Sequence, residues 1–148
     1  MRMLVVGAGS TGGYFGGRLA QAGRDVTFLV RPARAARLEE RGLEILSPHG
    51  DYTLRPQLVT ADRLSGFYDA ILLTVKAFSL ESALSDMAAA VGPETMILPV
   101  LNGMRHVDIL AKRTERVHVR DVDVVVVARM LDGVVRHVDD FLITAGRE

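Results

Sequence analysis

The sequence MLVVGAGSTGGYFGG at residues 3–17 decides the fold. Four apolar residues, typical of a buried strand, lead directly into the pattern Gly-x-Gly-x-x-Gly at residues 7–12, and helix-forming residues continue to Ala22. The order of strand, glycine turn and helix is the context that marks a dinucleotide-binding turn. We therefore interpret the stretch as a dinucleotide site; the alternative is a glycine turn with a purely structural role.

Each glycine of this pattern has its own physical role. Gly7 permits the sharp turn off the strand, Gly9 lets a pyrophosphate approach the backbone, and Gly12 lets the helix pack closely on the strand. The helix that follows presents its unpaired N–H groups and the positive end of its dipole. The turn is therefore predicted to face the phosphates of the nucleotide.

Length and composition fit one ordinary globular domain. Of the 148 residues, 49% are hydrophobic and 24% are charged, and acidic and basic side chains are equal at 18 each. This balance gives no reason to expect nucleic acid or a membrane surface as a partner. The chain has no cysteine, which excludes disulfides, and no apolar run approaches the ~20 residues of a membrane span. We expect a cytoplasmic protein and find no residues with metal-site spacing.

The rest of the chain alternates between strand-like and helix-like segments. We predict buried strands at residues 25–30, 58–59, 68–76, 95–101, 122–130, 134–138 and 141–145. Helices or helical turns are predicted at residues 33–41, 61–64, 79–91 and 105–113, and a hairpin at residues 43–54. The alternation predicts an α/β fold, a Rossmann-type doubly wound and mostly parallel sheet with helices on both faces and antiparallel strands near the C-terminus.

The end of the second predicted strand is where such a fold selects its nucleotide. NAD sites place an acidic residue about 20 residues beyond the glycines, whereas NADP sites place an arginine there. This chain has the sequence LVR at residues 29–31, with Arg34 and Arg37 close behind. A guanidinium matches a phosphate in shape and charge, so Arg31 favours NADP(H). The alternative is that these arginines solvate a helix face, which is the interpretation we adopt for Arg37.

Two polar residues lie at the carboxyl ends of later predicted strands. Lys76 ends strand 68–76, and Asn102 follows strand 95–101. Ligands bind beyond these strand ends in a doubly wound sheet, so both side chains are predicted to face one crevice. Alternatively, Lys76 is a solvated boundary charge and Asn102 begins a helix as its N-cap, a role that a binding function also permits.

The sequence resembles the ketopantoate reductase family, whose members are also called 2-dehydropantoate 2-reductases. The likeness rests on GAGSTGGYFGGRLAQAG at residues 7–23, FLVR at 28–31, LLTVKAF at 72–78, LPVLNGM at 98–104 and GVVRHVDDF at 133–141. The family reduces the keto group of ketopantoate with NADPH, on the route to pantothenate and coenzyme A. Residues 114–123 depart from the family pattern.

The resemblance implies a role for each matching position. Arg31 would bind the 2′-phosphate, Lys76 would line the cleft for cofactor and substrate, and Asn102 would contact the nicotinamide ribose and the substrate. The last two would be supporting catalytic residues, because the family's main catalytic lysine belongs to a second, mostly helical domain. The pyrophosphate would be held by Gly7, Ala8, Gly9, Ser10, Thr11 and Gly12.

We expect residues 1–148 to form one NADP-binding Rossmann domain that lacks the family's helical domain. Such a chain would supply the cofactor-binding half of a reductase of 2-keto acids and would be inactive by itself. A non-catalytic NADP-binding sensor or partner module is the alternative, and an interaction protein is a third. Apolar surface that a second domain would have covered favours a homo-oligomer.

Overall fold

The computed structural model describes residues 1–100, so the predictions made for residues 101–148, including Asn102 and the antiparallel strands, lie outside the described residues. The described helices are α1 Ser10–Gln21, α2 Pro32–Arg41 and α3 Leu80–Met87, with short 3₁₀ turns η1 Ala61–Arg63, η2 Ala77–Ser79 and η3 Ala88–Ala90. The described strands are β1 Arg2–Val6, β2 Asp25–Leu29, β3 Leu43–Ile45, β4 Tyr52–Leu54, β5 Gln57–Val59, β6 Ala70–Leu73 and β7 Met96–Pro99.

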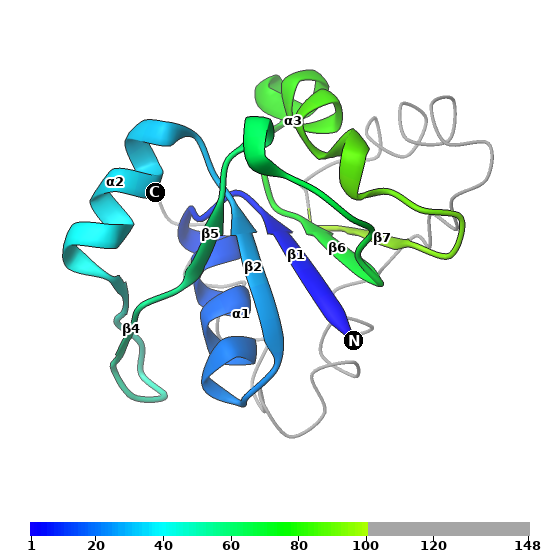
Figure 1. Ribbon diagram of the computed structural model, residues 1–148. Helices are drawn as coiled ribbons and strands as arrows, with labels where there is room; N and C mark the ends of the chain where they lie inside the picture. The colour runs from blue at the N-terminus through cyan, green and yellow to red at the C-terminus, as the bar shows by residue number, and fades with distance from the viewer. Residues whose placement is uncertain (101–148) are drawn as a thin grey trace.

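Five of these strands form one parallel sheet in the order β5-β2-β1-β6-β7, drawn side by side in Figure 1. Alternate residues of the central strand point to opposite faces, as the pleat requires. Met3 and Val5 lie in the core that α1 and α2 cover, whereas Leu4 and Val6 lie in the core that α3 covers. The predicted doubly wound α/β sheet with helices on both faces is therefore confirmed.

Local sequence explains how the first two helices begin and end. Pro32 opens α2, where its fixed φ suits the first helical turn, and Gly42 follows the last residue with φ +79°. Gly23 follows α1 with φ +77°, and its N–H donates to Ala20 O at 3.0 Å. Both glycine stops were predicted, and both helices end within a residue of the predicted position.

The predicted hairpin is confirmed as an antiparallel pair of β3 and β4 that packs on α1. Glycines on that helix make the close approach possible, since a Cβ added at Gly17 would lie 2.5 Å from Ile45 Cδ1. Arg18 is only 8% exposed and donates hydrogen bonds to Ser47 Oγ and Gly50 O in the hairpin turn. The helix therefore contacts the hairpin both at β3 and at its turn.

One predicted strand is too long, because residues 68–76 contain only the four-residue strand β6. Its parallel neighbour β1 ends at Val6, and the chain then turns away at Gly7, which has φ +96°. Thr74 N still donates to Val6 O at 3.2 Å, but within residues 1–100 no strand pairs with residues 75 and 76. Lys76 consequently lies in a loop beyond the strand instead of at its last position.

Candidate coenzyme-binding site

A cleft of about 1070 Å³ lies at the carboxyl edge of the parallel sheet. It lies between the ends of the neighbouring strands β1 and β6. The helix after β1 covers one face of the sheet and the helix after β6 covers the other, so this is the switch point at which doubly wound sheets bind ligands. The walls come from the glycine turn, the start of α2, the hairpin strand β3 and the segment from Thr74 to Asp86. Residues that are far apart in sequence thus share one concave surface.

The glycine turn has the geometry that its sequence predicts. Gly7 adopts φ +96°, and its N–H donates to Leu29 O at 3.1 Å. A Cβ at Gly12 would lie 2.1 Å from Gly7 O, so only glycine lets α1 approach the turn this closely. A Cβ at Gly9, by contrast, would meet nothing within 4 Å, which leaves an open backbone surface facing the cleft.

The end of α1 that faces the turn carries no negative side chain. Its N-cap is Gly9, which makes no side-chain capping bond, and no acidic residue lies in the first turn. The first N–H groups of a helix have no partner within the helix, and they carry the positive end of its dipole. Ser10 also lines the cleft, so this helix end is suited to an anionic group such as a phosphate.

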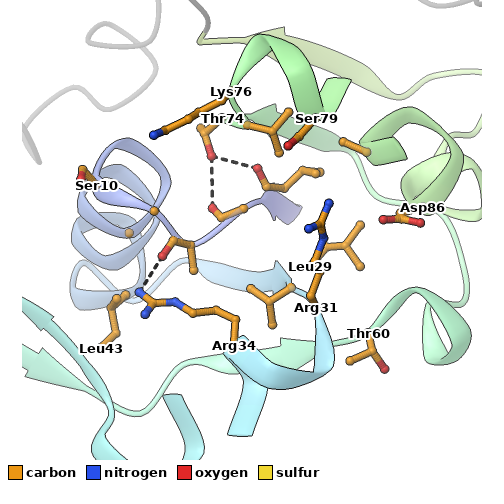
Figure 2. A pocket seen from close by; sticks show the side chains of 18 of the residues that line it. Ser10, Leu29, Arg31, Arg34, Leu43, Thr60, Thr74, Lys76, Ser79 and Asp86 are labelled. Atoms are coloured by element: carbon orange, nitrogen blue, oxygen red, sulfur yellow. Dashed lines mark hydrogen bonds between the residues drawn. The ribbon is translucent and has the colours of Figure 1, made fainter. Parts of the chain in front are cut away.

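Thr74, which was not predicted as a site residue, connects the glycine turn to the segment after β6. Its hydroxyl lies 2.9 Å from Val6 O and 3.1 Å from Gly7 O, shown as dashed lines in Figure 2. The same oxygen would lie 2.3 Å from a Cβ on Gly12. The sequence does show a hydroxyl residue, Thr74, just after an apolar strand. Its contact with the glycine turn could be predicted only by knowing that this strand, β6, pairs with β1.

Two arginines of the α2 end line the cleft, as Figure 2 shows. Arg31 is exposed at the N-cap position, and within residues 1–100 its guanidinium makes no hydrogen bond. Arg34 reaches back to the glycine turn, where its NH2 group donates to Ala8 O at 2.8 Å. Arg37 is exposed and does not line the cleft, in keeping with the solvated role expected for it.

Lys76 lines the opposite part of the cleft from α2, at the N-cap position of η2. Its backbone oxygen accepts a hydrogen bond from Ser79 N at 2.8 Å, while its side chain is exposed. Phe78, in the turn that follows, is 86% exposed and also lines the cleft. A cation and an aromatic ring thus lie together at this rim.

The cleft also contains carboxylates, among them Asp62 of η1. The pKa of Asp62 is lowered, first by a hydrogen bond from the Thr60 side chain and further by its own backbone N–H and the charge of Arg63. The carboxyl group is therefore ionised at neutral pH. Asp62 and Arg31 place opposite charges in the same cleft.

The structure brings most of the predicted site residues together. Gly7, Ala8, Gly9, Ser10, Arg31 and Lys76 all line the cleft. Thr11 and Gly12 do not belong to its lining; Gly12 is buried behind the turn instead, where it packs against Gly7 and Thr74. Asn102 lies outside the described residues. The hairpin wall, which includes Leu43 and Ile45, was not predicted as part of the site.

Within residues 1–100, no group of three or more metal-ligating side chains occurs. No helix in the same part of the chain is long and apolar enough to cross a membrane.

The chain is similar to proteins of a known family. The sequence model of the family "Ketopantoate reductase PanE/ApbA" matches residues 3–147. The uncharacterized oxidoreductase YkpB of Bacillus subtilis (strain 168) is 45% identical over 106 residues, which cover 72% of this chain and 35% of that protein.

Solved structures of related enzymes have a similar fold. D-mandelate dehydrogenase in ternary complex with NADH and anilino(oxo)acetate has a TM-score of 0.71 and 29% identity, covering 79% of this chain and 39% of that one. The 2-dehydropantoate 2-reductase of Methylococcus capsulatus has a TM-score of 0.68 and 30% identity over the same shares of the two chains. The present chain spans 35–39% of the length of these three proteins. With the glycine turn, the switch-point cleft and the sequence match in agreement, the chain belongs to the ketopantoate reductase PanE/ApbA family.

Proposed function

We propose that this chain binds NADPH in the switch-point cleft and contributes the coenzyme-binding part of a 2-keto acid reductase, with ketopantoate as the substrate that is reduced to pantoate. The observation that carries the proposal is the position of Arg31. It lies in the same cleft as the glycine turn, two residues after the end of β2, where an NAD-selective site would have a carboxylate. The family match supports the reaction class.

The described residues fit a phosphorylated dinucleotide in three respects. The open surface at Gly9 is a place that any Cβ would fill, so a pyrophosphate can lie against the backbone there. The start of α1 offers unpaired N–H groups to the same phosphates. Arg31 has no competing hydrogen-bond partner among residues 1–100, and its guanidinium is available for a 2′-phosphate.

When bound, the coenzyme would supply a hydride for the keto carbon of the substrate. The residues of this chain would bind and orient it. The turn from Gly7 to Ser10 would hold the pyrophosphate, and Arg31 would hold the 2′-phosphate. Lys76, an exposed cation on the other side of the cleft, would attract the carboxylate of a 2-keto acid or donate a hydrogen bond to the nicotinamide ribose. Asn102 is proposed, by resemblance, to assist there.

The proposal predicts a clear preference for NADPH over NADH, measured by fluorescence titration of the 148-residue chain. Arg31→Ala should lose most of the preference, because it removes the cation that would pair with the 2′-phosphate while leaving the turn intact. A bidentate arginine–phosphate contact is worth about 1.5–3 kcal/mol, or roughly 10- to 100-fold in affinity. Arg37→Ala, in α2 but outside the cleft, is the matched control and should bind like the parent chain.

Equal affinities of the parent chain for the two coenzymes would contradict the NADP assignment. NADPH consumption with ketopantoate then separates the reductase from its alternative, a non-catalytic NADP-binding sensor or partner module. The chain should support turnover only when a helical domain of the family is supplied. Binding without turnover even then would favour the sensor or partner module.

A further inference from the structure

Arg34 makes a contact that its place in the sequence does not reveal. It lies in the first turn of α2, yet its NH2 group donates a hydrogen bond to Ala8 O, 26 residues earlier, at 2.8 Å. Figure 2 shows the side chain running from α2 along the cleft to the turn. The arginine therefore joins the α2 end of the cleft, where Arg31 lies, directly to the glycine turn.

Described neighbours hold the turn from three directions. β2 holds it through Gly7 N, which donates to Leu29 O at 3.1 Å, and Thr74 holds it through the oxygens of Val6 and Gly7. The contact from Arg34 reaches one residue further along the turn, to Ala8. It is the one of the three that lies directly beside Gly9, where the backbone is open to the cleft.

We propose that Arg34 is a positioning residue that fixes the glycine turn in the conformation that receives the coenzyme phosphates. The inference rests on the proposed function, since it assumes that a dinucleotide occupies the cleft. A hydrogen bond donated by a charged group is stronger than a neutral one, and a turn that is already fixed loses less entropy when a ligand binds. The two arginines would then have separate tasks, Arg34 holding the turn and Arg31 binding the 2′-phosphate.

This division of tasks predicts different effects on NADPH and NADH for the two arginines. NADPH and NADH share the pyrophosphate that lies on the turn, so loss of the Arg34 contact should weaken both by the same factor. Loss of Arg31 should weaken NADPH alone. Arg34→Met keeps much of the side-chain length without a donor, whereas Arg34→Lys keeps a charged donor that can reach a carbonyl oxygen.

The experiment titrates both coenzymes into the 148-residue chain and its variants, with thermal melts to confirm folding. Arg34→Met should weaken NADPH and NADH equally, by about tenfold, and Arg34→Lys should restore most of the affinity. Arg37→Met, one turn further along α2 and outside the cleft, should bind both as the parent does. Hydrogen exchange in the coenzyme-free chain should be faster for the peptide spanning residues 7–13 in Arg34→Met alone.

The outcomes separate this inference from the proposed function. Unchanged exchange and unchanged binding in Arg34→Met would overturn the positioning role while leaving coenzyme binding intact. Weakening of NADPH alone would also overturn it, because Arg34 would then act on the 2′-phosphate. If the parent chain binds neither coenzyme, the proposed function fails, and the exchange measurement still decides whether Arg34 holds the turn.

Discussion

At the scale of single residues, the Thr74 hydroxyl shows how a short side chain can organise a binding site. It lies within hydrogen-bonding distance of two consecutive backbone oxygens, of Val6 and Gly7, at the point where β1 ends and the glycine turn begins. Lys76 follows two residues later at the rim of the same cleft. The hydroxyl therefore ties the turn, which is proposed to hold the pyrophosphate, to the segment that carries Lys76, which is proposed to lie at the nicotinamide side.

Replacing Thr74 by valine tests this role, because valine has nearly the same shape but no donor. We expect the free energy of unfolding to fall by about 1–2 kcal/mol, since the turn loses a partly buried hydrogen bond. Coenzyme affinity should fall as well. Thr74→Ser keeps the hydroxyl and should restore the affinity even if it costs some stability through the lost methyl group. Urea unfolding and NADPH titration measure the two effects, and equal binding by both variants would show that the hydroxyl has no positioning role.

At the scale of secondary-structure elements, the glycines of α1 form two rows with different partners. A Cβ at Gly12 or Gly16 would meet the turn or β2, at 2.1 Å from Gly7 O and 2.7 Å from Phe28. A Cβ at Gly13 or Gly17 would meet β3 of the hairpin. Residues four apart share a helix face, so one row lets the helix approach the sheet and the other lets the hairpin approach the helix.

Gly9 lies outside both rows and allows coenzyme binding to be tested apart from packing. Its φ of −82° suits any residue, and an added Cβ would meet nothing within 4 Å. Gly9→Ala should therefore change the free energy of unfolding by less than about 1 kcal/mol, yet abolish detectable NADPH binding by filling the surface on which the pyrophosphate would lie.

Gly12→Ala serves as the contrasting variant, because its Cβ would collide with Gly7 O. We expect it to lose about 1–3 kcal/mol or more of stability together with binding. Thermal melts and fluorescence titration distinguish the two variants. Tight NADPH binding by Gly9→Ala would mean that the phosphates do not lie at this turn.

The sequence predicted the strand–turn–helix unit and the ends of α2 well, because glycine, proline and apolar spacing act over a few residues. It predicted β6 too long, since a strand ends where its neighbour ends, and β1 is about 67 residues away in sequence. The contact of Thr74 depends on the same pairing of β1 with β6, and the contact of Arg34 depends on the pairing of β1 with β2. Part of the site was thus readable from local pattern, whereas the contacts that hold the glycine turn needed the assembled sheet.

At the scale of the whole molecule, the described fold presents apolar side chains around its functional edge. Phe78 is 86% exposed and Leu46 is 78% exposed, and both line the cleft, one from η2 and the other next to β3. Phe67, 63% exposed, lies beyond the cleft lining. Large apolar side chains that gather at one site are commonly covered by a partner, and a second copy of the same chain is the simplest partner available.

We therefore expect the chain to self-associate, as the sequence had suggested, and expect the association to depend on this rim. Light scattering from low to high micromolar concentration should show a rising mean mass. Phe78→Ser should reduce the rise, because it removes the most exposed of the three side chains. Phe67→Ser is the matched control and should leave the mass curve unchanged. A constant monomer mass at high micromolar concentration would contradict self-association, and equal effects of the two variants would mean that the contact lies elsewhere on the surface.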